Sequence, residues 1–151
     1  MAQVTSRARV LMDTNILLYA ATADVGTTKH TADKIETSLD LVMRHDLLIS
    51  AQNILEFTAN ARKARGAALS HGAALEWIDL FLEYPFMPNT RPLVVMAVDY
   101  AFRYKIRAFE AAMLAAANAG RVDLVYSEDL NHGQTYGSVR VCNPFIEDFL
   151  T

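Results

Sequence analysis

Short apolar runs alternate with longer amphipathic stretches along this chain, and the alternation predicts strands that are separated by helices. The expected strands lie at 10–12, 47–49, 122–126 and 139–141, and a loop is expected over 131–137. Apolar residues at helical spacing predict helices that begin near Ile16 and cover 31–44, 52–65, 70–84, 92–104 and 109–119. Phe86 and Met87, between two prolines, are compatible with a short edge strand. Because parallel strands are joined by helical crossovers, this order predicts an α/β fold with a parallel sheet.

The length and composition predict one domain over residues 1–151, since 151 residues of which 52% are hydrophobic can bury a substantial core. The single cysteine, Cys142, excludes an intramolecular disulfide framework and a cysteine-based zinc site, which is typical of a reducing compartment. No apolar run reaches the roughly 18 residues of a membrane span, and polar residues split the early apolar stretch. We therefore expect a cytoplasmic protein without a membrane partner.

The first candidate for chemistry is Asp13, where the apolar run Val10–Met12 stops at a carboxylate. Thr14 and Asn15 follow, and a helical segment then begins. In open α/β sheets ligands bind beyond the carboxyl ends of the strands, so an acid at this junction is a site candidate. The alternative is that Asp13 only caps the helix.

Three other acids fall in comparable places. Glu56 lies within an apolar helical turn just after the second strand, and Glu110 lies in the first turn of a helix of small apolar residues. Asp129 follows the strand that ends at Tyr126, after Ser127. Taken singly, Glu56 fits an exposed helix face and Glu110 fits compensation of the helix dipole. Together with Asp13 they predict one acidic cleft, because the ends of parallel strands share one edge of a sheet.

Clustered carboxylates need protons or cations, since two unit charges about 4 Å apart repel by roughly 4 kcal/mol near a protein surface. An all-oxygen cluster favours Mg²⁺ or Mn²⁺ over zinc. Mg²⁺ binds through a few carboxylates together with substrate phosphates, so phosphodiester chemistry is the predicted reaction class. The formal net charge of −3 does not indicate a nucleic-acid binder, but without these four acids the fourteen bases and thirteen acids give +1.

Four motifs together resemble a PIN-domain ribonuclease, and most closely a VapC-type toxin of a prokaryotic toxin–antitoxin pair. The motifs are MDTNILLYA, NILEF, YKIRAFEAAMLAAA and YSEDLNHG with VCNPF, in that order over nearly the whole chain. The resemblance implies a three-layer α/β/α sandwich on a parallel sheet, metal-dependent endoribonuclease activity on RNA, a homodimer and a cognate antitoxin that blocks the site. It also implies that Asp13, Glu56 and Asp129 are metal-site acids, and that Thr14, Asn15 and Ser127 support them.

Glu110 departs from the family pattern, which usually has Asp at this position. The charge is kept, but the side chain is one methylene longer, and a metal site tolerates little misplacement of its ligands. One hypothesis is an active ribonuclease in which Asp13, Glu56, Glu110 and Asp129 hold one or two Mg²⁺ or Mn²⁺ ions. The other is a catalytically weakened module that still binds nucleic acid or an antitoxin. A haloacid-dehalogenase-like phosphotransfer enzyme is disfavoured, because it would need an acid where this chain has Asn15.

Basic residues cluster in two segments and are the candidates to steer an RNA backbone towards the acids. As solvated helix faces they would need no partner, which is the alternative for each cluster. The candidate RNA-binding residues are Arg62, Lys63, Arg65, Arg103 and Arg107.

Overall fold

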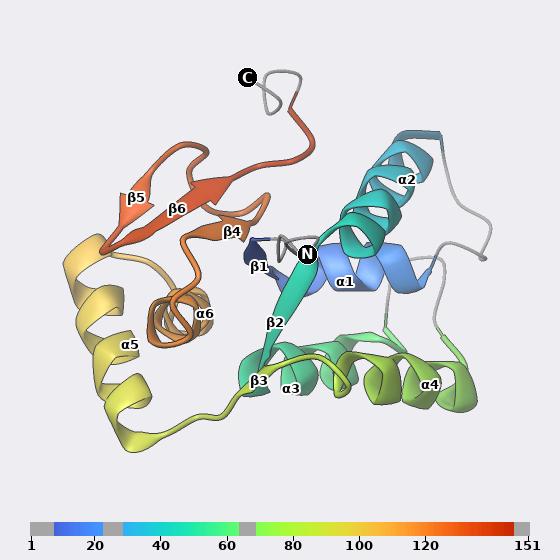
Figure 1. Cartoon of the computed structure of the whole chain (residues 1–151). Helices are drawn as coiled ribbons and strands as arrows, with labels where there is room; N and C mark the ends of the chain where they lie inside the picture. The colour runs from blue at the N-terminus through green and yellow to red at the C-terminus, as the bar shows by residue number, and fades with distance from the viewer. Residues whose placement is uncertain (1–7, 23–28, 64–68, 147–151) are drawn as a thin grey trace, which may run out of the picture.

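The computed structural model describes residues 8–22, 29–63 and 69–146, and its centre is a mostly parallel sheet (Figure 1). Among the described residues the sheet has six strands in the order β3-β2-β1-β4-β6-β5. All neighbouring pairs are parallel except β5 with β6. The strands are β1 Arg9–Met12, β2 Asp46–Ser50, β3 Phe86–Met87, β4 Leu124–Tyr126, β5 Thr135–Tyr136 and β6 Val139–Cys142.

Helices cover both faces of this sheet, as Figure 1 shows. The helices are α1 Thr14–Ala21, α2 Lys29–Arg44, α3 Ala51–Asn60, α4 His71–Phe81, α5 Arg91–Tyr104 and α6 Ala108–Ala119. Helices α5 and α6 pack together on one face, and α1 to α4 lie on the other. The predicted three-layer α/β/α fold is therefore confirmed.

Successive residues of the central strands point into two different cores. Leu11 of β1 and Leu48 of β2 pack with α5 and α6, whereas Val10 and Met12 of β1 pack with the helices of the opposite face. All four side chains are almost completely buried. Burial on both faces explains why these strands are continuous apolar runs without polar alternation.

Several predicted boundaries were wrong, and each error has a local cause. The strand expected from Val122 begins at Leu124, because Arg121 adopts φ 57° and the Val122 amide donates to the Ala117 carbonyl to close α6. The expected loop over 131–137 contains β5, which forms a hairpin with β6. The helix expected over 52–65 runs from Ala51 to Asn60 and passes into a turn, and its predicted end at 65 lies outside the described residues.

The core on the face covered by α1 to α4 contains aromatic packing between α3 and α4. The rings of Phe57 and Phe81 are fully buried with centroids 5.3 Å apart, and Trp77 lies against Phe81 at 5.7 Å. This packing fixes α3, which carries one of the candidate acids, against its neighbours. In the part of the chain that the structure describes, no helix has the length and apolarity to span a bilayer.

Candidate active site

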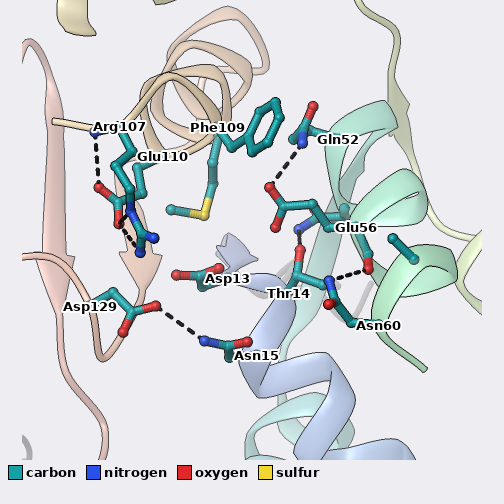
Figure 2. Close-up of a pocket in the computed structure, with 13 residues that line it drawn as sticks. Asp13, Thr14, Asn15, Gln52, Glu56, Asn60, Arg107, Phe109, Glu110 and Asp129 are labelled. Atoms are coloured by element: carbon teal, nitrogen blue, oxygen red, sulfur yellow. Dashed lines mark hydrogen bonds and ion pairs between the residues drawn. The ribbon is translucent and has the colours of Figure 1, made fainter. Parts of the chain in front are cut away.

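The four predicted acids line one cavity of about 370 Å³ at the carboxyl ends of the central strands. Asp13 follows β1, Asp129 follows β4, Glu56 comes from α3 and Glu110 from the start of α6. Figure 2 shows Asp13 in the middle, Glu56 on one side, and Glu110 and Asp129 on the other. The cavity is lined by Asp13, Thr14, Asn15, Gln52, Asn53, Glu56, Ala59, Asn60, Arg107, Phe109, Glu110, Met113 and Asp129.

Asp13 is the most deeply placed acid, with only 8% of its surface exposed. Its backbone amide donates to the Tyr126 carbonyl at 2.8 Å, which continues the pairing of β1 with β4 past the end of the strand. Asp13 is the N-cap residue of α1, yet its side chain makes no capping hydrogen bond. The carboxylate instead accepts a 2.8 Å hydrogen bond from the Ser127 hydroxyl. Asp13 therefore faces the cavity, and its side chain does not serve as a helix cap.

Burial raises the pKa of Asp13 from 3.8 to about 6. The Ser127 hydroxyl opposes this rise in pKa, while the negative charges of Asp129 and Glu56 add to it. A carboxylate that is costly to ionise beside two others is a site where a bound cation would be stabilised. The charges of Asp129 and Glu56 therefore reach Asp13 across the cavity.

Asp129 is held by the polar residues around it. Its carboxylate accepts a 3.1 Å hydrogen bond from Asn15, and its backbone amide donates to the Ser127 hydroxyl at 3.2 Å. Burial, followed by the charges of Glu128 and Glu110, raises the pKa of Asp129. Ser127 therefore links Asp13 to the loop that carries Asp129.

Asn53 joins the two strand-to-helix junctions and was missed by the sequence analysis. Its buried amide donates to the Met12 carbonyl at 3.0 Å and to the Thr14 hydroxyl at 3.2 Å, while its side-chain oxygen accepts from the Ser50 amide. Glu56 follows three residues later and accepts a 2.8 Å hydrogen bond from Gln52. Asn53, Glu56 and Asn60 at i, i+3 and i+7 share one face of α3, and this spacing was the signal available in the sequence.

The Glu110 carboxylate is hydrogen-bonded by the residue that precedes its helix. One carboxylate oxygen accepts from Nε and Nη2 of Arg107 at 3.2 and 3.1 Å, and the other accepts from the Arg107 backbone amide at 3.3 Å. Arg107 is the N-cap residue of α6, so Glu110 at position N3 reaches back to it as in a capping box. The local-helix alternative for Glu110 therefore describes part of what this side chain does.

The other predicted RNA-binding bases that the structure describes do not line this cavity. Arg62 and Lys63 are exposed in the turn after α3, and neither belongs to the lining residues. Arg103 pairs with Asp99 on α5, as the i, i+4 spacing predicts, and its guanidinium lies 5.9 Å from the rings of Tyr100 and Tyr104. Arg65 lies outside the described residues. Of the predicted bases that the structure describes, only Arg107 lines the cavity with the acids.

The donor set suits a hard divalent cation whose remaining ligands are water. Within residues 8–22, 29–63 and 69–146, no group of three or more His, Cys, Asp or Glu side chains is arranged to hold a metal ion. Mg²⁺ usually keeps several waters and binds through one or two carboxylates together with substrate phosphates. The cavity has four carboxylates among its lining residues and neither the cysteine nor the histidine that zinc favours, which fits that mode of binding.

The sequence gives no match to a protein-family model and none to a curated protein. Solved structures, in contrast, match over most of the chain. A toxin–antitoxin complex from Klebsiella pneumoniae contains a chain with TM-score 0.65 and 17% identity, covering 90% of this chain and 98% of that one. VapC20 of Mycobacterium tuberculosis, described as a toxin that cleaves the sarcin–ricin loop, has TM-score 0.60 and 17% identity, covering 87% and 98%.

DNA-bound VapBC from Salmonella typhimurium gives a TM-score of 0.59 at 13% identity and covers 89% of this chain and 96% of that one. Identities this low establish the fold alone. The order of strands, the helices on both faces and the match to nearly the full length of these chains agree with one another. The chain therefore has the PIN-like α/β/α fold of VapC-type toxins.

Proposed function

We propose that this chain is a metal-dependent endoribonuclease that hydrolyses RNA phosphodiesters and acts as the toxin of a toxin–antitoxin pair. The observation that supports the proposal most is the convergence of Asp13, Glu56, Glu110 and Asp129 from four separate segments on one cavity. The fold shared with VapC20, itself a toxin that cleaves the sarcin–ricin loop, supports the same reaction class.

Asp13, Glu56 and Asp129 are the carboxylates proposed to hold one or two Mg²⁺ or Mn²⁺ ions, with one or two of them as direct ligands of an ion and the others acting through its bound waters. When bound, the ion would activate a water molecule for attack on phosphorus and stabilise negative charge on the phosphate. The Ser127 hydroxyl fixes the orientation of the Asp13 carboxylate, and the Asn15 amide fixes that of Asp129. Thr14 is anchored through Asn53 and keeps the start of α1 at the floor of the cavity.

Single-stranded RNA is the proposed substrate, and two residues beside the acids suit it. Arg107 supplies a positive charge at the cavity, which favours contact with a phosphate. Phe109 lines the same cavity although 64% of its surface is exposed, so its ring is accessible to a nucleobase. Stacking of bases on aromatic rings is the usual way in which unpaired strands are bound.

The proposed partners are a cognate antitoxin, which would block the cavity, and a second copy of this chain. Solved complexes with the same fold are described as toxin–antitoxin or VapBC assemblies, which supports the first partner. A row of exposed apolar side chains along α5 supports a protein contact on that helix. The row consists of Val94, Val95, Val98 and Phe102, of which Phe102 is 82% exposed.

The test is cleavage of a mixed-sequence single-stranded RNA by the purified chain. Cleavage is expected with Mg²⁺ or Mn²⁺ and is expected to stop in EDTA. Asp13→Ala should abolish cleavage while the protein remains folded, and Asp79→Ala, which removes an exposed carboxylate on α4, should leave it intact. Cleavage that persists in EDTA would refute the proposal. For the toxin role, expression in a bacterial host should arrest growth, and Asp13→Ala should not.

A second candidate is a weakened enzyme that mainly binds RNA or the antitoxin. Both Glu110 oxygens accept hydrogen bonds from Arg107, and a carboxylate shared with this cation is a weaker ligand for a metal ion. This contact favours the weakened enzyme. Glu110→Asp separates the two functions. A large gain in cleavage rate would indicate a site impaired by the longer side chain, and an unchanged or lower rate would favour a fully active enzyme that uses Glu110.

A further inference from the structure

Both carboxylate oxygens of Glu110 accept hydrogen bonds from the same neighbour, Arg107. Oε1 accepts from Nε and Nη2 of Arg107, and Oε2 accepts from the backbone amide of the same residue. The Glu110 side chain is only 16% exposed, so these contacts are partly shielded from water. An ion that used Glu110 as a ligand would have to compete with the Arg107 guanidinium for the same carboxylate charge.

Arg107 is anchored at its backbone but presents its charge to the cavity. Its side chain is 78% exposed, and its guanidinium is held at Nε and Nη2 by Glu110. In the described part of the chain Nη1 has no hydrogen-bond partner, so the end of the fork is free to donate. A planar guanidinium with one edge fixed and the other open can bind a phosphate at two points.

Arg107 lines the same cavity as Asp13, Glu110 and Asp129, so its guanidinium lies among these acids. Contact with Glu110 is the main cause of the raised pKa of Arg107, and the charges of Asp129 and Asp13 add to it. The pKa of Asp129 is raised by burial and by its acidic neighbours, and the charge of Arg107 opposes that rise. Figure 2 shows the Arg107 side chain folded back over Glu110, on the side of the cavity where Asp129 lies.

The extra methylene of Glu110, compared with Asp, lets its carboxylate reach back to Arg107. A residue at position N3 must reach back over one helical turn to meet the N-cap residue, and Glu does this in capping boxes. Asp in the same place would hold its carboxylate closer to the helix axis and further from the Arg107 guanidinium. Glu110 therefore holds the Arg107 guanidinium in a defined position.

We propose that Arg107 binds a phosphate of the substrate and that Glu110 is the residue that positions Arg107, rather than a fourth ligand of the metal ion. This inference rests on the proposed function, because it concerns the same cavity. It assigns ion binding to Asp13, Glu56 and Asp129, and substrate anchoring to the pair on α6. The rival arrangement has Glu110 as a metal ligand and Arg107 as a cation that the metal displaces.

The experiment measures RNA binding and ion binding separately. The RNA probe is a short, fluorescent, single-stranded 2′-O-methyl phosphorothioate oligonucleotide of mixed sequence, followed by anisotropy in Mg²⁺ and in EDTA. The ion probe is Mn²⁺ alone, followed by calorimetry without RNA. The variants are Arg107→Ala, Arg107→Lys, Glu110→Gln and the double variant of Arg107→Ala with Glu110→Gln. Asp13→Asn is the reference for loss of ion binding, and Arg91→Ala serves as a charge-matched control because Arg91 is exposed at the start of α5. Thermal unfolding confirms that each variant is folded.

We expect Arg107→Ala to weaken oligonucleotide binding about tenfold, Arg107→Lys to weaken it less, and Arg91→Ala to change it by less than about twofold. Glu110→Gln should weaken it about threefold, and the double variant should be no worse than Arg107→Ala, because a positioning residue acts only through its partner. Mn²⁺ affinity should change by less than about threefold in Glu110→Gln but fall more than about tenfold in Asp13→Asn.

Three results would overturn the inference. The first is a loss of Mn²⁺ affinity in Glu110→Gln as large as in Asp13→Asn, and the second is oligonucleotide binding that does not respond to Arg107→Ala. The third is additive losses of RNA affinity in the double variant, which would show that Glu110 does not act through Arg107. If the unaltered protein binds no Mn²⁺, the proposed metal-dependent function fails, while the anisotropy arm still decides the role of Arg107.

Discussion

Replacing Asp13 by Asn should stabilise the metal-free protein at neutral pH, although it removes the central acid of the site. Asp13 has an ordinary pKa of 3.8, and burial raises its pKa to about 6 in the folded protein. The folded state therefore binds a proton more tightly than the unfolded state does. Stability from this group is fully present below about pH 4 and is lost as the pH rises through 6.

The difference of about 2 pKa units corresponds to about 3 kcal/mol of unfolding free energy at neutral pH. Asn cannot ionise, and its side-chain oxygen can still accept the hydrogen bond from Ser127. In EDTA at about pH 7.5, urea unfolding should show Asp13→Asn to be more stable by up to about 3 kcal/mol, and at about pH 4.5 the gain should shrink to about 1 kcal/mol. Asp79→Asn, at an exposed position on α4, serves as the control and should show no such pH-dependent gain.

Mg²⁺ provides the second half of this experiment. An ion that binds only the folded protein stabilises it by about 2.7 kcal/mol at one hundred times its dissociation constant. Added Mg²⁺ at about pH 7.5 should therefore recover most of the stability that Asp13 costs, and it should have little effect on Asp13→Asn. The reasoning is refuted if Asp13→Asn in EDTA is less stable than the unaltered protein at both pH values.

Three further predictions concern residues around the site and on α5. Asn53→Ala should lower the unfolding free energy by about 1 to 3 kcal/mol, measured by urea unfolding, because the Ser50 amide and the Met12 carbonyl lose their buried partner; a loss below a few tenths would contradict this. Lys34→Met breaks the 2.7 Å ion pair with Glu128, the residue next to Asp129. It should lower the unfolding free energy by about 1 kcal/mol in the same assay and should slow RNA cleavage. An unchanged cleavage rate would contradict the predicted effect on activity. Phe102→Asp should convert a homodimer into a monomer in light scattering, and a monomeric parent protein would contradict the dimer prediction.

The sequence predicted the fold and the acidic cavity where the signal was local. The strand that stops at Asp13 is followed by a helix, and the crossover order of strands and helices determines which edge of the sheet collects the acids. These features follow from apolar runs and polar junctions that are visible within a few residues. For the same reason Glu56, Glu110 and Asp129 could be assigned to one cavity before any distance was known.

The features that the sequence did not predict depend on contacts between distant segments or on the direction in which a side chain points. Asn53 was overlooked because its partners Met12 and Thr14 are about forty residues away in the sequence. Arg62 and Lys63 were grouped with Arg107 by their charge, yet only Arg107 turns towards the acids. Sequence spacing gives the face of a helix but not the neighbour that covers it.

The lengths of the outermost strands limit how this protein can associate. At both edges of the sheet, β3 and β5 consist of two residues each. A long bare edge invites strands of other chains to extend the sheet, whereas such short edges offer few unpaired backbone groups. Growth by addition of strands is therefore disfavoured from either side. Contacts with other molecules are therefore expected on the helical layers, where α5 exposes Val94, Val95, Val98 and Phe102, rather than at the sheet edges.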